Sequence, residues 1–341
     1  MQYSKELEQT ARDLAGAGRG ILAADESTGT IGKRLQTIGV ENTEENRRAY
    51  RDLLFSAPDV SKFISGVILY DETIRQKTAA GVPFPQYMQQ NNMIPGIKVD
   101  TGAKDLAGSN GEKVTEGLDG LADRLAEYHK LGARFAKWRA VIEIDAERPS
   151  AYALTTNAHA LARYAVLCQA AGIVPIVEPE VLMDGDHNIE RCFAVTEHVL
   201  RRVFDALYEQ HVVLENILLK PNMVIAGKKC KVQASVDEVA TQTLRCLKRS
   251  VPAAVPGIVF LSGGQSNELA TAHLNAMNAQ KSSLPWLLSF SYGRALQAPV
   301  LEAWRGKPEN VPAAEQALLL RARLNSAACF GKYSEDLERA G

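Results

Sequence analysis

The 341-residue sequence predicts a single α/β domain that spans residues 1–341 and folds as a (β/α)8, or TIM, barrel. Three observations support this prediction. Short apolar, β-branched runs occur eight times, segments with helical periodicity lie between most of them, and nearly every run ends in charged or small polar residues. In such a barrel the carboxyl ends of all the strands meet on one face, where a site can form.

The eight runs predict strands at regular intervals along the chain. In order, they are Gly20–Ala24, Ile64–Tyr70, Ile94–Val99, Ala133–Trp138, Ile173–Val177, Asn216–Leu219, Gly257–Leu261 and Pro285–Phe290.

The intervening segments predict helices. Apolar residues recur at helical spacing from Leu118 to Tyr128 and from Cys192 to Leu207, and Ser235 with Glu238 forms a capping box at a helix start. A doubly wound sheet is the main alternative fold. It requires a glycine-rich phosphate loop after an early strand, and neither GxGxxG nor GxxxxGK[ST] occurs.

Composition and charge narrow the class of protein. The formal net charge is -1, and the charged runs are short and of mixed sign, so nucleic acid is not an expected partner. A 46% hydrophobic and 23% charged composition excludes a disordered or fibrous chain. We expect no signal peptide and no membrane segment, because the most apolar stretch, Val251–Leu261, is interrupted by Pro252 and Pro256. Five scattered cysteines without a CxxC pair favour a reducing, cytoplasmic location.

Three lysines, Lys98, Lys137 and Lys220, lie at the carboxyl ends of predicted strands. Burial and neighbouring cations can lower the pKa of such a lysine far enough for it to attack a carbonyl as an amine. The alternative is a lysine that is simply ion-paired at the rim of the barrel. These patterns do not decide which of the three would be the nucleophile.

Carboxylates accompany the lysines. Glu178 and Glu180 lie two residues apart, as do Lys137 and Arg139, so each pair points to one side of its strand if the strand continues that far. Imine formation needs a carboxylic acid to carry protons, and Asp25 is a further isolated carboxylate. An ion-pair network that only closes the barrel mouth is the alternative.

The tails of the last two strands predict a phosphate site. Ser262, Gly263 and Gly264 follow the seventh strand, and Ser291, Gly293 and Arg294 follow the eighth. Glycine N–H groups and an arginine fork bind phosphate, and barrels often hold phosphate at these two loops. A turn without a ligand is the alternative.

A metal site is not expected. Five histidines (His129, His159, His198, His211 and His273) fall in predicted helical stretches. The segment Asp184–His187 is more typical of a polar turn than of a metal site.

The motifs along the chain are similar to those of the class I fructose-bisphosphate aldolase family. They are GILAADEST, ENTEENRR, PGIKVD, FAKWR, GIVPIVEPE, LLKPNM, FLSGGQS and SFSYGRALQ, and the similarity runs from about Gly18 to Tyr333. The resemblance implies a (β/α)8 barrel that forms a homotetramer and cleaves fructose 1,6-bisphosphate to dihydroxyacetone phosphate and glyceraldehyde 3-phosphate, without metal or other cofactor.

The resemblance also implies roles for individual residues. Lys220 would be the Schiff-base lysine, Glu178 would transfer protons during imine formation, and Glu180 would orient and pair with the lysines. Asp25 would take the C4 hydroxyl proton, and Lys137, supported by Arg139, would favour a neutral Lys220. The C1 phosphate would lie at Ser262, Gly263, Gly293 and Arg294. The C6 phosphate would lie at Ser27, Thr30, Lys33, Arg34 and Lys98.

Two departures from the family pattern modify these expectations. Thr30 stands where Ser is expected, which keeps the hydroxyl. The segment Ser334–Gly341 contains no terminal Tyr, so we expect enamine protonation to limit turnover. Two other functions are possible on the same fold: a transaldolase-like enzyme acting on a monophosphate, and a non-catalytic protein-binding scaffold. The basic residues after the first strand argue against the former, and the presence of Lys220, Glu178 and Asp25 argues against the latter.

Overall fold

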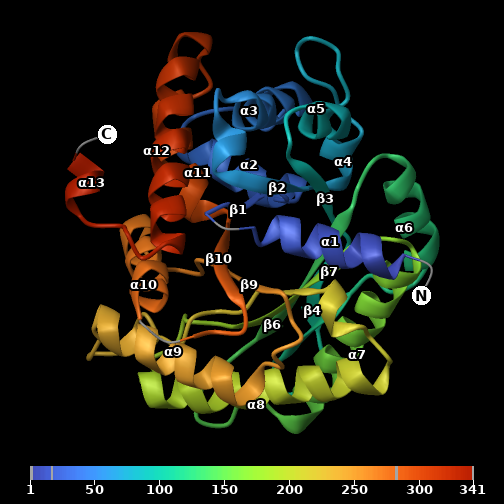
Figure 1. Ribbon diagram of the computed structural model, residues 1–341, viewed down its shortest axis with the longest axis vertical. Helices are drawn as coiled ribbons and strands as arrows, with labels where there is room; N and C mark the ends of the chain where they lie inside the picture. Colours follow the sequence, from blue (N-terminus) through green and yellow to red (C-terminus); the bar gives the residue numbers. More distant parts are fainter. Residues whose placement is uncertain (1–2, 17, 281–282, 340–341) are drawn as a thin grey trace.

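Eight parallel strands close into a barrel in the computed structural model, which describes residues 3–16, 18–280 and 283–339. Neighbouring strands follow the order β1-β10-β9-β8-β7-β6-β3-β2 around the barrel (Figure 1). Their bounds are β1 Gly20–Ala23, β2 Ile64–Leu69, β3 Ile94–Lys98, β6 Phe135–Ile142, β7 Val174–Val181, β8 Leu218–Leu219, β9 Gly257–Phe260 and β10 Leu287–Tyr292. Each corresponds to one predicted apolar run, so the predicted barrel is confirmed.

Helices surround the barrel, as the helical periodicity predicts (Figure 1). The predicted capping box is present, because Ser235 caps helix α9 and its side chain accepts a hydrogen bond from the N–H of Glu238. The helices are α1 Ser4–Leu14, α2 Thr28–Thr37, α3 Glu44–Ser56, α4 Asp71–Ile74, α5 Phe84–Gln90, α6 Leu121–Lys130, α7 Ala151–Ala170, α8 Ile189–Glu209, α9 Val236–Ser250, α10 Asn267–Ala279, α11 Arg294–Trp304, α12 Val311–Cys329 and α13 Asp336–Arg339. None of these described helices is both long and apolar enough to cross a membrane.

Strands β6 and β7 extend four residues beyond their predicted ends. They pair in register from Phe135 opposite Val174 to Ile142 opposite Val181. The apolar runs stop earlier because charged residues begin there, yet the backbone ladder continues past those residues. The extension keeps Lys137 and Arg139 on one strand, beside Glu178 and Glu180 on the next.

Helix α1 covers the end of the barrel at which the strands begin. It crosses in front of the strands in Figure 1. Leu7, Ala11 and Leu14 are buried in a cluster that includes Phe135 and Val174 at the starts of β6 and β7. The hydroxyl of Ser65 on β2 donates a 2.6 Å hydrogen bond to the carbonyl oxygen of Leu14. The opposite end, at the carboxyl ends of the strands, stays open.

An antiparallel hairpin, which the sequence analysis did not predict, follows β3. Its strands are β4 Gly102–Asp105 and β5 Lys113–Glu116. The hydroxyl of Thr115 donates a 2.7 Å hydrogen bond to the carbonyl oxygen of Arg139, which attaches the hairpin to the open end of β6. The hairpin therefore forms part of the rim.

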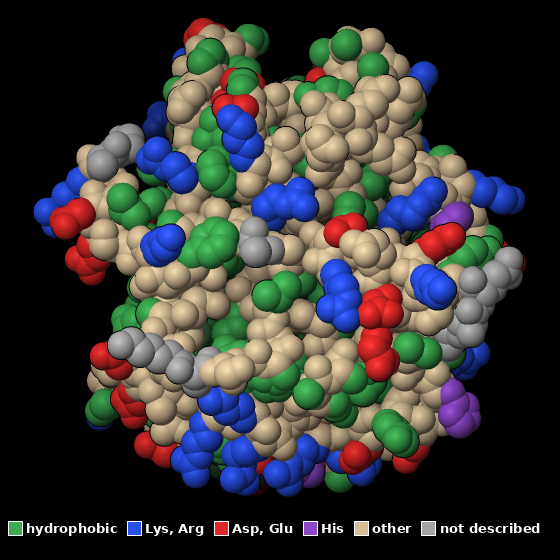
Figure 2. All heavy atoms as spheres, viewed as in Figure 1, with side chains coloured by type: hydrophobic (Ala, Val, Ile, Leu, Met, Phe, Trp, Pro, Cys, Tyr) green, Lys and Arg blue, Asp and Glu red, His purple; other side chains and the backbone are tan. Residues whose placement is uncertain are grey.

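Basic and acidic side chains are interspersed over most of the face shown in Figure 2. This distribution agrees with the near-zero net charge of the sequence.

Candidate active site

A cavity of about 560 Å³ opens at the carboxyl ends of the barrel strands and gathers nearly all the predicted site residues. Its lining includes Asp25, Ser27, Thr30, Arg34, Lys98, Lys137, Arg139, Glu178, Glu180, Lys220, Ser262, Gly263, Gly264, Ser291, Gly293 and Arg294. Residues at the carboxyl ends of seven barrel strands thus meet in one place. These strands are β1, β3, β6, β7, β8, β9 and β10. The polar residues at these strand ends converge on one face of the barrel, as the sequence predicts.

Lys33 is the one predicted site residue that does not line this cavity. It lines a neighbouring surface depression with Gly29 and Gly32. Lys33 and Arg34 are consecutive on helix α2, so their side chains leave the helix about 100° apart. Arg34 takes the side that faces the cavity, and Lys33 takes the outer side.

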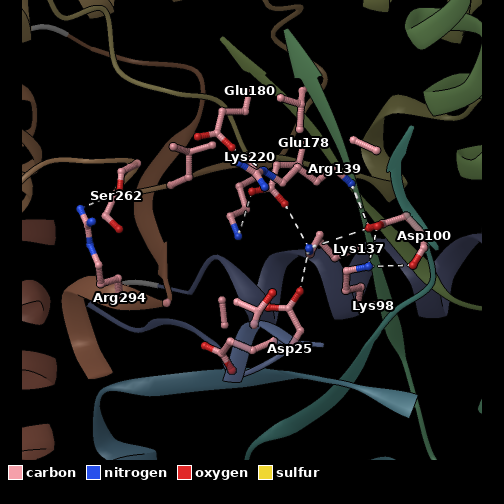
Figure 3. Close-up of a pocket in the computed structure, with 18 of the residues that line it drawn as sticks. Asp25, Lys98, Asp100, Lys137, Arg139, Glu178, Glu180, Lys220, Ser262 and Arg294 are labelled. Atoms are coloured by element: carbon pink, nitrogen blue, oxygen red, sulfur yellow. Dashed lines mark hydrogen bonds and ion pairs between the residues drawn. The ribbon is translucent and has the colours of Figure 1, made fainter. Parts of the chain in front are cut away.

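Lys137 on β6 lies between two carboxylates at the centre of the site (Figure 3). Its Nζ atom is 2.7 Å from Asp25 Oδ2 and 3.7 Å from Glu178 Oε2. Burial alone would lower the pKa of Lys137, but Asp25, Glu178 and Asp100 together raise it above the ordinary lysine value. Lys137 is therefore a permanent cation at neutral pH.

Asp25 follows β1 and stays ionised. Burial raises its pKa, but the opposing charges of Lys137 and Lys220 outweigh burial and lower the pKa to about 2. A carboxylate in this state can accept a hydrogen bond from a substrate hydroxyl.

Lys98 on β3 is paired with a carboxylate that the sequence analysis did not select. Its Nζ atom lies 2.5 Å from Asp100 Oδ1 and also donates a 2.7 Å hydrogen bond to the Asp100 carbonyl oxygen. Asp100 lies 4.0 Å from Lys137 Nζ through its other carboxylate oxygen. The signal was present in the polar tail after β3, where a lysine and an aspartate lie two residues apart.

Lys220 follows the two-residue strand β8, and its backbone N–H donates a 2.8 Å hydrogen bond to the Val177 carbonyl oxygen. Its side chain is buried, and its Nζ atom lies 3.3 Å from Glu178 Oε1. Glu178 thus contacts Lys220 through one oxygen and Lys137 through the other. The Glu178 carboxyl group therefore lies beside both side-chain nitrogens.

The family resemblance implied that Glu180 pairs with the lysines, but in the structure it pairs with Arg139 instead. Its Oε2 atom lies 2.5 Å from Arg139 Nε. In the paired strands Glu180 lies opposite Val141, two residues beyond Arg139, and the long arginine side chain reaches it along the rim. In the structure, Glu180 therefore holds Arg139.

The loops after β9 and β10 approach one another as the predicted phosphate site requires. The Arg294 guanidinium, which lies near Ser262 in Figure 3, donates hydrogen bonds through Nη2 to the carbonyl oxygens of Gly263, at 3.0 Å, and Gln265, at 3.1 Å. Gly263 has a φ of 56°, a left-handed conformation that favours glycine. The hydroxyl of Ser291 is buried without a hydrogen-bond partner among the described residues. Together these groups leave polar atoms available to an anion.

The start of α2 carries the other expected phosphate contacts. Ser27 caps this helix, and its hydroxyl lies 3.1 Å from that of Thr30, so both hydroxyls stand at the helix N-terminus. Arg34 Nη1 lies 2.5 Å from Glu26 Oε1. Gln297 also donates a 2.8 Å hydrogen bond to Glu26, which is buried and was not selected from the sequence. Glu26 therefore positions Arg34.

None of the described histidines lines this cavity. His129, His159, His198 and His273 are helical as predicted, but His211 is not: it lies in the turn after α8 with a φ of 58°. The helical periodicity of α8 ends just before it, at Leu207. Within the described ranges, no group of three or more His, Cys, Asp or Glu side chains has a geometry that could hold a metal ion.

Comparisons with known proteins give one consistent result. A family model described as fructose-bisphosphate aldolase class-I matches residues 6–341. A "probable fructose-bisphosphate aldolase class 1" of Xanthomonas campestris is 60% identical over 96% of this chain and 98% of its own. "Fructose-bisphosphate aldolase 6, cytosolic" of Arabidopsis thaliana is 55% identical over 98% of this chain and 93% of its own.

A solved structure agrees with these relatives. It is that of fructose-bisphosphate aldolase from Plasmodium falciparum, in a complex with TRAP and a small-molecule inhibitor. The two chains superimpose with a TM-score of 0.96 at 54% identity, over 98% of this chain and 96% of the other.

Proposed function

Because the chain belongs to the class I fructose-bisphosphate aldolase family, we propose that Lys220 is the amine that forms its Schiff base. The enzyme catalyses the reversible cleavage of fructose 1,6-bisphosphate to dihydroxyacetone phosphate and glyceraldehyde 3-phosphate. The lysine Schiff base is the property that defines class I, and the choice among three lysines is the open question.

The ion pairing of the three lysines carries the proposal. Lys137 is shared by three carboxylates, and Lys98 is held by the side chain and the backbone of Asp100. Among the described residues, Lys220 has one carboxylate within 4 Å, that of Glu178 at 3.3 Å. It is the amine that loses fewest interactions when it gives up its proton and attacks a carbonyl.

Glu178 is suited to the proton transfers of imine formation. Attack of Lys220 Nζ on the C2 carbonyl forms a C–N bond and gives a carbinolamine. Glu178, in its protonated form, then delivers a proton to the departing hydroxyl, which leaves as water while the C=N bond forms. The position of Glu178, 3.3 Å from Lys220 Nζ, supports its reach to the reacting nitrogen.

Asp25 is placed for the cleavage step. The proton leaves the C4 hydroxyl, the C3–C4 electron pair moves into the iminium, and the products are an aldehyde and an enamine on Lys220. Asp25 accepts the proton as an ionised carboxylate. Lys137, 2.7 Å away, orients Asp25 and binds substrate oxygens as charge moves through the site.

The two ends of the cavity bind the two phosphates. We assign the C1 phosphate to Ser262, Gly263, Gly264, Ser291, Gly293 and Arg294, and the C6 phosphate to Ser27, Thr30 and Arg34, with Lys98 at the same rim. Lys33 has no supported contact with substrate from its outer position on α2.

The assembly and location are proposed on the same family basis. We propose a homotetramer; one chain leaves large apolar side chains in solvent, among them Tyr208, at 79% exposure, and Val232, at 77%, and subunit contacts commonly bury such side chains. The Arabidopsis relatives named cytosolic support a cytoplasmic location. Sedimentation at several protein concentrations tests the oligomer.

Borohydride reduction in the presence of dihydroxyacetone phosphate, followed by peptide mapping, tests the central proposal. We expect one labelled peptide, modified at Lys220. Label on Lys98 or Lys137 would overturn the assignment of the nucleophile, and the Lys220→Arg variant should lose both the label and the cleavage activity.

A further inference from the structure

We propose that Lys228 is a specificity-determining residue, which adds a second cation, beside Arg294, for the phosphate at the Gly263–Arg294 end of the cavity. Lys228 lines the cavity, although it follows β8 by nine residues and belongs to none of the polar tails that predicted the site. The inference rests on the C1 phosphate site proposed above.

The backbone places Lys228 firmly. Three consecutive N–H groups of its loop donate hydrogen bonds to carbonyl oxygens of the loop after β7: Gly227 to His187 at 2.8 Å, Lys228 to Met183 at 2.7 Å, and Lys229 to Gly185 at 3.0 Å. The two loops are thereby joined edge to edge, so the base of the Lys228 side chain has a defined position at the rim.

The side chain extends from this rim over the glycine loop after β9. A side chain at Gly264 would collide with Cε and Nζ of Lys228, so the glycine leaves the space that the lysine occupies. The N–H of Gly264 donates only to a thioether, Met183 Sδ, at 2.8 Å. A thioether is a weak acceptor, which leaves this N–H available for exchange to a phosphate oxygen. Lys228 and the Gly264 N–H therefore lie together.

The ion pair of Lys228 is of a kind that a substrate can replace. Lys228 Nζ lies 3.2 Å from Asp184 Oδ1, and the two side chains are 42% and 67% exposed. Such a solvent-exposed ion pair contributes little to stability. A phosphate dianion offers Lys228 a greater opposite charge and more acceptor oxygens than Asp184 does. Arg294, the other cation at this end, already uses Nη2 to hold two backbone carbonyls. A second cation beside it favours a substrate with a phosphate here over one with a hydroxyl.

The test is the concentration of dihydroxyacetone phosphate that gives half-maximal borohydride labelling of Lys220. Its single phosphate is the one that the C1 site would bind. The variants are K228Q, the charge-conserving K228R, and the matched control K229Q, which removes the adjacent exposed lysine outside the cavity. R294A reports on the phosphate site itself, and unphosphorylated dihydroxyacetone reports on binding without that phosphate.

For K228Q we expect the half-saturating concentration to rise roughly three- to tenfold, with unchanged labelling at saturation. K228R should remain within about twofold of the wild type, K229Q should match it, and dihydroxyacetone should not distinguish the variants. High salt should shrink the effect, because the contact is between exposed charges. If R294A weakens binding and K228Q does not, or if K228Q lowers the labelling at saturation instead, this inference is wrong while the phosphate site stands. If neither variant weakens binding, the phosphate site is itself misplaced.

Discussion

A single carboxyl group, that of Glu178, connects the two central lysines of the site. One of its oxygens lies 3.3 Å from Lys220 Nζ and the other 3.7 Å from Lys137 Nζ. The second oxygen is buried without a hydrogen-bond partner among the described residues. A buried polar atom with unused capacity at a reactive centre is typical of a group that forms its bonds only when substrate arrives. This unused capacity supports the proposed role of Glu178 in proton transfer.

For Glu178→Gln we expect kcat to fall by roughly 10²- to 10⁴-fold, because the amide cannot carry the protons of imine formation. Single-turnover borohydride trapping should slow by a similar factor. Glu143→Gln is the matched control, since Glu143 pairs with Arg148 and does not line the cavity. A Glu178→Gln enzyme with wild-type trapping rates would show that another group transfers these protons.

The depressed pKa of Asp25 predicts a pH dependence of stability. Its pKa is about 2 in the folded protein and about 3.8 in the unfolded chain, so the unfolded state binds more protons in between. This group thus stabilises the fold fully above about pH 4 and loses that contribution as the pH falls toward 2. The full contribution is about 2 kcal/mol, from roughly 1.4 kcal/mol per pKa unit.

Denaturant unfolding from pH 6 to pH 2.5 measures this contribution. The difference in free energy of unfolding between the wild type and Asp25→Asn should be largest at the neutral end and should shrink as the pH falls below 4. A difference that stays constant across this range would mean that Lys137 does not hold Asp25 in its ionised form.

At the scale of elements, the site depends on where strands end and loops begin. The extension of β6 and β7 places two charged pairs side by side, and β4–β5 closes the rim beside them. The loops after β9 and β10 are joined by Arg294 through two backbone carbonyls. Arg294 therefore shapes the loop after β9, in addition to the charge that it would offer at the proposed C1 phosphate site.

For Arg294→Ala we expect a raised KM for fructose 1,6-bisphosphate and a smaller effect on a substrate that lacks the C1 phosphate. The lost charge-assisted contact corresponds to roughly a tenfold change or more. Steady-state kinetics with both substrates make the comparison, and Arg305→Ala, an exposed arginine at the other end of the same helix, is the control. Equal effects on the two substrates would indicate that Arg294 only supports the loop.

At the scale of the whole molecule, the barrel separates stability from chemistry. Helix α1 buries Leu7, Ala11 and Leu14 at one end, and the charged cavity opens at the other. This division is usual in (β/α)8 barrels, in which the amino-terminal end of the strands serves stability. Changes at α1 should therefore alter the free energy of unfolding without altering catalysis.

Leu7→Ala tests this separation, because Leu7 is only 2% exposed. We expect a loss of roughly 2 to 5 kcal/mol in the free energy of unfolding, from lost burial and the cavity left behind. The KM and kcat values at 25 °C should stay within about twofold of the wild type. Glu8→Ala, one residue along on the solvent side of the helix, should change neither. A large rise in KM for Leu7→Ala would show that the two ends are coupled.

Much of the fold and site follows from patterns along the chain. Each of the eight apolar runs became a barrel strand, because a strand that is buried on both faces must be apolar nearly throughout. Polar residues at the ends of seven of those runs, from Asp25 to Arg294, met in one cavity because all carboxyl ends of parallel strands lie on the same side. Local order thus determined the architecture and most of the candidate residues.

Tertiary structure decided which groups interact. Residue types alone left three lysines equivalent. Only the packing of the described residues shows Lys137 within 4 Å of three carboxylates, Lys98 paired with Asp100, and Lys220 within 4 Å of Glu178. The direction of a helix face turned Lys33 away from the cavity that Arg34 enters, and hydrogen bonds between loops brought Lys228 into it. Pairing, facing and burial depend on contacts between residues far apart in the chain, and short-range spacing carries no information about those contacts.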